Sequence, residues 1–318
     1  MNFIDIGKRT EIYADGVHDD TSAIQRCLDE LKNGGRIYFP DGTYLISSCL
    51  IFYSNQHLDF SDNAVLLRSD KSEIITKYML ASYSEPDVGG YNGTHDVTIT
   101  GGIFDGNKNL TEKLTILNTV HCKNITVKNV KFVHGALWHY IEFNSTESAL
   151  VSKCVFDGMS YTVKREDLTS ELIQVDAAIV GAYGPVYDCS GKEIEFLPDK
   201  IPCRLVEIDS CVFECGGFSA IGHHGNDEHI DIVISNNVFK GPSGNAEASR
   251  GYISFMELSH GIKIENNVFD TQGSDMKCVG ILTKSNRMNA VEAANNVFEG
   301  NFEEYFIGNV VEENNIKR

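Results

Sequence analysis

The sequence predicts a right-handed parallel β-helix, an all-β, single-stranded solenoid of short strands with one α-helix laid over its first coil. Three observations lead to this fold class: a strand motif that recurs along the chain, asparagine pairs at the bends of several repeats, and one amphipathic helix near the N-terminus. No single repeat can bury its own apolar side, so successive coils must stack into a continuous core. We therefore expect one domain over residues 1–318.

The recurring motif is an alternating strand, a bend and a hydrophobic pair that ends in phenylalanine. A looser copy ends at Phe104, and the six clear copies end at Phe132, Phe156, Phe213, Phe239, Phe269 and Phe298. Counted from Phe104, these phenylalanines lie 28, 24, 57, 26, 30 and 29 residues apart. The outsized interval predicts a full coil with a long inserted loop at residues 177–203. The otherwise even spacing disfavours the alternative of an antiparallel sandwich.

Asparagine pairs mark the bends of the last three copies, at Asn236-Asn237, Asn266-Asn267 and Asn295-Asn296. The alternation before each bend is typical of a strand with one buried face. Asparagine tolerates left-handed backbone angles and hydrogen-bonds neighbouring backbone groups. Where the coils stack in register, we expect the asparagines to form hydrogen-bonded ladders.

Residues 19–33 are predicted to form the N-terminal helix. Asp20 or Thr21 is the expected N-cap, and Gly34-Gly35 is the expected end. One apolar stripe runs along the helix, formed by Ile24, Cys27, Leu28 and Leu31. An open β-helix end exposes unpaired backbone groups, so we expect this helix to cap the first coil.

Composition excludes several classes of partner. The formal net charge of -18 argues against nucleic acid and against an anionic membrane surface. The apolar runs are far shorter than the roughly 18 residues that span a bilayer. The nine cysteines are interpreted as reduced packing residues. The first residues lack a basic region followed by an apolar stretch, so we expect no secretory signal peptide in the sequence as given.

One further pattern lies in the N-terminal segment. It consists of Asp15-Gly16, Asp19-Asp20-Thr21, Ala23-Ile24-Gln25 and the run Gly34-Gly35-Arg36-Ile37-Tyr38-Phe39-Pro40-Asp41-Gly42-Thr43-Tyr44. This pattern resembles the pectate-lyase/polygalacturonase superfamily, and more narrowly its branch of phage tailspikes and bacterial polysaccharide depolymerases. The resemblance implies a polysaccharide substrate, an extracellular or virion location reached without a signal peptide in this sequence, and a homotrimer as the assembly that tailspikes form.

Aligning the coils by their inward apolar pairs predicts which residues face outward. We take Ile141/Phe143, Ile173/Val175, Ile253/Phe255 and Val279/Ile281 as the inward pairs. One outward column then reads Glu142, Gln174, Gly222, Ser254 and Gly280, and the next reads Asn144, Asp176, His224, Met256 and Leu282. Because neighbouring strands lie about 4.8 Å apart, these columns predict a contiguous polar strip.

The strip suggests glycoside hydrolysis, which needs a protonated acid and a second carboxylate. Asp176 and Glu142 are the predicted pair, and His224 could tune one carboxyl or donate a proton itself. The segment 222–225 also weakly resembles the Gly-His-Gly of polygalacturonases. It lacks that family's adjacent Asp-Asp pair and its Arg-x-Lys, which argues against pectin as the substrate.

Six further residues are predicted to bind substrate. Gln174, Asn144 and His223 are candidate hydrogen-bonding partners, while Tyr140 and Tyr252 either stack against sugar rings or pack against side loops. Glu171 has inward parity in this register, so it either pairs with a buried partner or lies at a bulge.

Two alternatives to hydrolysis stay open. β-Elimination or epimerisation of a uronate polymer needs a cation and a basic group, yet Lys284 is the one cationic residue along the predicted strip, and Arg204 and Arg250 lie in flanking loops. We expect no cofactor and no metal for a hydrolase, and Ca²⁺ if the protein is a lyase. The other alternative is a non-catalytic carbohydrate-binding or structural tail protein.

Overall fold

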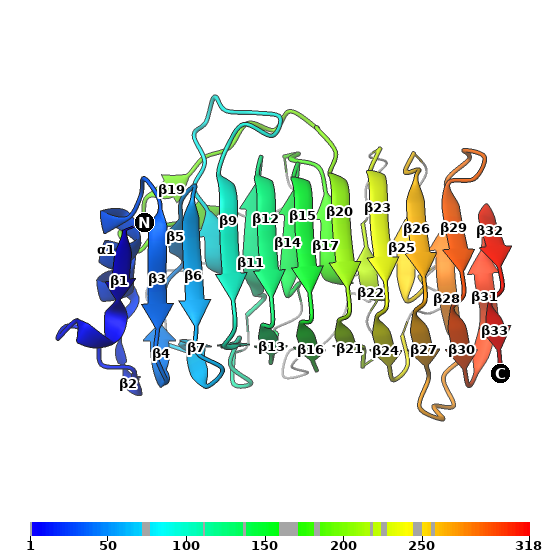
Figure 1. The fold of residues 1–318 in the computed structure, drawn as a ribbon, viewed down its shortest axis with the longest axis horizontal. Helices are drawn as coiled ribbons and strands as arrows, with labels where there is room; N and C mark the ends of the chain where they lie inside the picture. Colours follow the sequence, from blue (N-terminus) through cyan, green and yellow to red (C-terminus); the bar gives the residue numbers. More distant parts are fainter. Residues whose placement is uncertain are drawn as a thin grey trace.

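The computed structural model describes residues 2–71, 77–110, 112–135, 138–158, 171–180, 185–216, 219–223, 228–243, 250–255 and 258–318. The coils stack along the long axis, with the two termini at opposite ends (Figure 1). Three parallel sheets run the length of this stack. The predicted parallel β-helix is confirmed.

The three sheets are called A, B and C throughout. Sheet A contains β1 Phe3–Asp5, β3 Gly35–Phe39, β6 Gln56–Phe60, β9 His95–Thr100, β12 Lys123–Lys128, β15 Glu147–Ser152, β20 Arg204–Asp209, β23 Ile230–Ser235, β26 Ile262–Glu265, β29 Val291–Ala294 and β32 Val310–Glu313. Sheet B contains β2 Asp15–Asp19, β4 Gly42–Ile46, β7 Ala64–Arg68, β10 Ile103–Asp105, β13 Lys131–Val133, β16 Val155–Asp157, β21 Val212–Glu214, β24 Val238–Lys240, β27 Val268–Asp270, β30 Val297–Glu299 and β33 Ile316–Lys317. Sheet C contains β5 Leu50–Phe52, β8 Tyr78–Ser82, β11 Thr115–Val120, β14 Ile141–Asn144, β17 Glu171–Asp176, β22 Ser219–Gly222, β25 Ile253–Phe255, β28 Cys278–Thr283 and β31 Phe302–Ile307.

The phenylalanine that ends each repeat lies in sheet B and points into the core. Five successive pairs of these rings are stacked, with centroids 5.1, 4.6, 4.8, 4.8 and 4.7 Å apart from Phe132 to Phe298. The stack crosses the long interval between Phe156 and Phe213 without a break. The inserted residues therefore leave the stack of coils without disturbing its register.

Part of the insertion forms an antiparallel hairpin, β18 Val186–Tyr187 and β19 Glu193–Ile194. Ala178, Val186 and Ile194 pack with residues of β5 and β8 in a second apolar cluster. This cluster covers the outer face of sheet C at its N-terminal strands.

The two asparagines of each pair have different roles. The first, as in Asn266, adopts a left-handed φ of 58° and is exposed. The second, as in Asn267, is fully buried. The backbone N–H groups of Cys211, Asn237, Asn267 and Asn296 each donate to the side-chain oxygen of the asparagine one coil on, at 2.8–3.0 Å. The predicted ladder is therefore present, and it continues to Asn315.

Replacing Asn267 by alanine is expected to destabilise the fold by about 2–4 kcal/mol. The substitution leaves the buried N–H of Asn237 and the carbonyl of Ile234 without the bonds that Asn267 now makes, and each such group costs about 1–3 kcal/mol. The matched control is Asn266→Gly, which keeps the left-handed backbone and should cost no more than about 1 kcal/mol. Urea unfolding measures both. Equal losses of unfolding free energy in the two variants would show that the ladder does not stabilise the fold.

The N-terminal helix, α1, spans Thr21–Glu30, shorter than the predicted 19–33, and a 3₁₀ turn, η1, spans Ile6–Lys8. Asp20 holds the N-cap position, but its carboxylate accepts hydrogen bonds from Tyr13 and Ala14. The side-chain amide of Gln25 accepts from the N–H of Ile51 at 2.8 Å and donates to its carbonyl at 3.0 Å. Ile51 lies in β5, the edge strand of sheet C at its N-terminal end. Gln25 therefore forms the bonds that a further parallel strand would supply there.

Candidate functional site

The predicted polar strip lies on sheet C, where β14 and β17 run side by side. Glu142 is directly opposite Gln174, and Asn144 is directly opposite Asp176. Gly222 lies opposite Gln174 on the next strand. The register that the apolar pairs predict is therefore correct over these three coils, and Glu142 and Asp176 are diagonal neighbours.

The predicted register also holds at Ser254, which lies opposite Gly222, but it is wrong at the next strand. Ser254 lies opposite Leu282 instead of Gly280, and Ile253 lies opposite Ile281. A slip of two residues keeps every side chain on its own face, so alternation alone could not detect it. His224, predicted to be catalytic, and Met256 lie outside the described residues.

Glu142 occupies a buried polar environment. Its side chain is 2% exposed. Asn144 Nδ2 donates to Glu142 Oε1 at 3.2 Å, and Thr115 Oγ1 donates to Oε2 at 3.4 Å. Burial raises the pKa of Glu142 from 4.5 to about 7, although both of these hydrogen bonds oppose the shift. A large fraction of this carboxyl group is therefore protonated at neutral pH.

Asp176 is held by its neighbour on the same strand. The side chain is 5% exposed, and Gln174 Nε2 donates to Asp176 Oδ2. Two amide oxygens of the strip, Asn144 Oδ1 and Gln174 Oε1, are buried and have no hydrogen-bond partner within the part of the chain that the structure describes. Buried acceptors of this kind are normally satisfied, so these two could accept hydrogen bonds from a ligand.

Glu171 differs from its prediction in part. One of the two predicted alternatives was a buried partner, and Glu171 has one. Arg250 Nη1 lies 2.7 Å from Glu171 Oε1, and the side chains of Arg250 and Glu171 are 8% and 0% exposed. The inward parity is wrong. The consecutive residues Leu172 and Ile173 both pack into the core, so alternation fails at this corner. Gly222 is on the outer face of sheet C, and a Cβ placed on it would lie 3.4 Å from Glu171 Cγ. Glu171 therefore joins the polar strip on the outer face, as part of an ion pair.

Tyr140 and Tyr252 are not sugar-stacking platforms, and this prediction is wrong. Both rings are fully buried in the main core. Their hydroxyl groups donate to the carbonyls of Asp157 and Gly241, at 2.8 and 2.7 Å. Each tyrosine immediately precedes its strand, at a corner of the coil where outward parity does not apply.

His223 also differs from its prediction as a substrate ligand. It is fully buried, its ring lies 4.5 Å from that of His229, and it meets Phe255 edge-on at 5.7 Å. Its parity with Ile221 places it on the inner face of sheet C. Among the described residues, no group of three His, Cys, Asp or Glu side chains is arranged to hold a metal ion.

Three residues of the site were missed in the sequence. Asn118 lies on β11 directly opposite Glu142, and extending the alternation backwards by one repeat would have found it. Thr115, on the same strand, donates to Glu142 although it has the parity of the inward Leu117, so alternation alone could not have found it. Arg250 lies 79 residues from Glu171 along the chain. No local pattern marks it, because only the folded coil brings the two together.

No helix among the described residues is long and apolar enough to cross a membrane.

Comparison with known proteins finds one relative by sequence, several solved structures with the same fold and one matching family model. The plasmin and fibronectin-binding protein A of Streptococcus pneumoniae is 27% identical over 202 residues, which cover 57% of this chain. The chain spans only 28% of that relative's length.

Two solved structures share the fold at low identity. The hyperthermoactive exopolygalacturonase of Thermotoga maritima aligns over 99% of this chain and 81% of its own, with a TM-score of 0.64 and 14% identity. A tailspike mutant of Escherichia coli bacteriophage HK620, in complex with a hexasaccharide, aligns over 94% and 53%, with a TM-score of 0.68 and 12% identity. A family model described as rhamnogalacturonase A/epimerase, pectate lyase-like, matches residues 3–161.

Proposed function

Because the chain belongs to the rhamnogalacturonase A/epimerase, pectate lyase-like family, we propose that it is a polysaccharide-degrading glycoside hydrolase. The observation that carries this proposal is the pairing of Glu142, whose pKa is raised to about 7, with Asp176 on the adjacent strand. A hydrolase needs one protonated and one ionised carboxyl flanking the scissile bond. Different surroundings of two carboxyl groups are the usual means of separating these roles.

In this proposal Glu142 is the general acid and gives its proton to the leaving glycosidic oxygen. Asp176, which accepts a hydrogen bond from Gln174, acts as base or nucleophile. Asn144 donates to Glu142, and its free carbonyl oxygen could accept a sugar hydroxyl. His224 stays a predicted third member of the site.

The substrate that we propose is a bacterial or plant polysaccharide outside the cell. The net charge of -18 disfavours a strongly anionic polymer unless bound cations such as Ca²⁺ offset the repulsion. The hexasaccharide bound to the tailspike neighbour supports an oligosaccharide as ligand. Extracellular or virion location and a homotrimer belong to the same proposal, and sedimentation equilibrium tests the trimer.

Asp176→Asn is expected to lower hydrolysis by about 10²–10⁴-fold, the usual contribution of an acid–base group. The assay is release of reducing ends from a panel of bacterial and plant polysaccharides. Asp231→Asn is the matched control, because Asp231 is exposed on β23 of sheet A. Full activity in Asp176→Asn would refute the proposed mechanism. An ultraviolet-absorbing unsaturated product would instead identify a lyase.

One observation favours a second candidate, a non-catalytic surface protein that binds carbohydrate. Glu142 and Asp176 are only 2% and 5% exposed, so a polymer can reach them only if the residues above them rearrange. The name of the curated relative also describes a binding protein. For such a protein, the whole panel of polysaccharides would stay intact, and Asp176→Asn would bind its ligand unchanged.

We further propose that α1 caps the first coil. The support is the Gln25 amide, which satisfies both backbone groups of Ile51 on the outermost strand of sheet C. Unpaired groups on such an edge would invite pairing with another chain.

A further inference from the structure

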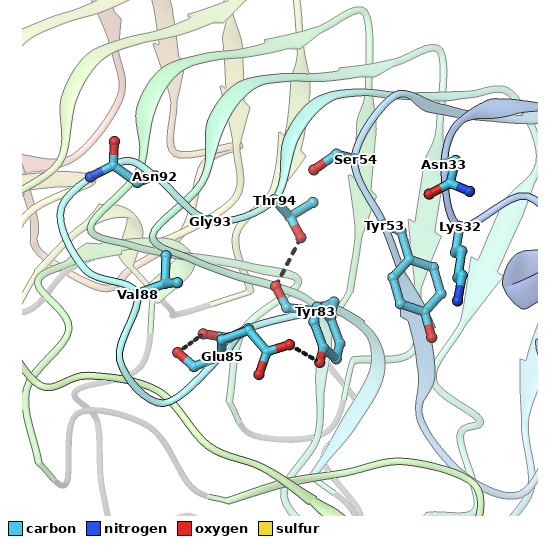
Figure 2. Close-up of a pocket in the computed structure, with 11 residues that line it drawn as sticks. Lys32, Asn33, Tyr53, Ser54, Tyr83, Glu85, Val88, Asn92, Gly93 and Thr94 are labelled. Carbon is cyan, nitrogen blue, oxygen red and sulfur yellow. Dashed lines mark hydrogen bonds between the residues drawn. The ribbon is translucent and has the colours of Figure 1, made fainter.

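A pocket of about 510 Å³ opens near the N-terminal end of the stack, away from the carboxylate strip. Figure 2 shows the two tyrosines Tyr53 and Tyr83 between Lys32 and Asn33 on one side and Glu85 on the other. Tyr53 directly follows β5, and Tyr83 directly follows β8. In sheet C, β11 separates β8 from β14, so the strand that ends before Tyr83 lies about 10 Å from the strand of Glu142, at about 4.8 Å per strand.

The two tyrosine rings are fixed in position. Their centroids lie 5.4 Å apart with an interplanar angle of 40°. The Tyr53 hydroxyl donates to Asp29 Oδ1 at 2.8 Å, and the Tyr83 hydroxyl donates to Glu85 Oε1. Both side chains pack on the second apolar cluster and are half-buried. Rings held in this way lose little conformational freedom when a ligand stacks on them.

Polar groups surround the rings. Lys32 and Asn33 are exposed at the end of α1, and their side chains form no hydrogen bond or ion pair with any other described residue. Glu85 is exposed on the opposite wall. Apolar faces beside separate donors and acceptors match a pyranose ring, which presents C–H groups on its faces and hydroxyl groups on its edge.

A second hollow of about 200 Å³ adjoins the pocket. The two share Tyr83, Ser84 and Glu85, and the second extends to Lys192 and Glu193 of the inserted hairpin region. We refer to the two adjoining hollows as the groove, and their combined size suits more than one sugar residue. The acidic groups Asp29, Glu85, Glu193 and Glu195 outnumber Lys32 and Lys192 around this groove. This balance disfavours an anionic ligand.

We propose that this groove binds a neutral oligosaccharide through Tyr53 and Tyr83, as an anchoring site separate from the carboxylate strip. It would hold a polymer on the N-terminal coils while another part of the same chain reaches β14 and β17. The choice of a polysaccharide as ligand rests on the proposed function, whereas the preference for neutral sugars comes from the groove itself.

Calorimetric titration with maltohexaose, cellohexaose and laminarihexaose tests this inference, with hexagalacturonate as the anionic comparison. The protein carries Asp176→Asn throughout, so binding is measured without turnover. We expect at least one neutral hexasaccharide to bind, Tyr83→Ala to weaken it at least 10-fold, and Tyr83→Phe to change it less than threefold. Tyr13→Ala, which removes an exposed tyrosine outside the pocket, is the control.

Binding of no neutral hexasaccharide, or equal binding by Tyr83→Ala, would overturn the inference. If Tyr83→Ala does not fold, Tyr83→Leu keeps the apolar bulk without the ring and answers the same question. If a neutral hexasaccharide binds but the wild-type protein leaves every polysaccharide of the reducing-end assay intact, only the proposed hydrolase activity is refuted. Hydrolysis without binding at Tyr83 would refute the anchoring site alone.

Discussion

Glu142→Gln is expected to lower polysaccharide hydrolysis by about 10²–10⁴-fold, as the loss of a general acid does. Glutamine keeps the shape of the side chain and can still bond to Asn144 and Thr115, so the fold should survive. It has no proton to give to the leaving oxygen. Reducing-end assays measure the loss, and Glu207→Gln, an exposed position on β20, is the matched control.

The same carboxyl predicts how activity depends on pH. Since the pKa of Glu142 is about 7, the acid form disappears as the pH rises through 7, and hydrolysis should decline with it. A pH profile that is flat between about pH 6 and pH 9 would contradict the role of Glu142 as the acid.

Stability provides a second readout of Glu142 that needs no substrate. Its pKa is about 7 in the folded chain against an ordinary value of 4.5, so between these values the folded state binds a proton that the unfolded state lacks. The free energy of unfolding should therefore fall as the pH rises through this window. At about 1.36 kcal/mol per pKa unit, the fall contributed by Glu142 is about 3 kcal/mol. Urea unfolding of the wild type and Glu142→Gln across this range should show a smaller fall in the variant.

Arg250→Met is expected to destabilise the fold by about 3–5 kcal/mol, because it strips a buried carboxylate of its ionic partner. Glu171 is 0% exposed and lies 2.7 Å from the guanidinium. Removing both charges with Glu171→Leu and Arg250→Met should restore much of the loss, since burying an ion pair is itself costly. Chemical unfolding of the single and double variants measures the coupling.

Arg287→Met is the matched control for this pair. Arg287 pairs with Glu228 at the surface, where both side chains are 41% exposed, and such pairs contribute about 0–1 kcal/mol. If Arg250→Met and Arg287→Met had the same small effect, the buried pair would not stabilise the fold. A double variant as unstable as Arg250→Met alone would show that the apolar replacements do not pack there.

The sequence predicted those features that repeat. Spacing between phenylalanines predicted the stacked coils, and the inward apolar pairs placed Glu142 opposite Gln174 and Asn144 opposite Asp176. Both results depend on side-chain alternation within regular strands, which is a local property of the chain.

The errors occurred where alternation stops or cannot discriminate. Tyr140 and Tyr252 precede their strands at corners, where the chain turns both side chains into the core. The slip that placed Ser254 opposite Leu282 preserves the face of every residue. Burial of the strip, which sets the pKa of Glu142, depends on how distant segments cover sheet C, and a pattern within one strand carries no information on this.

The asparagine ladder has a consequence for how such a molecule can change length. Each buried asparagine bonds to the coil before it and the coil after it. If one coil of this pattern were duplicated, the asparagine of the new coil would therefore find the same hydrogen-bonding partners in the coils before and after it as the original asparagine does. Growth or shortening by whole turns should be tolerated far from the carboxylates, whereas a gain or loss of part of a turn would break the run of asparagines at that point.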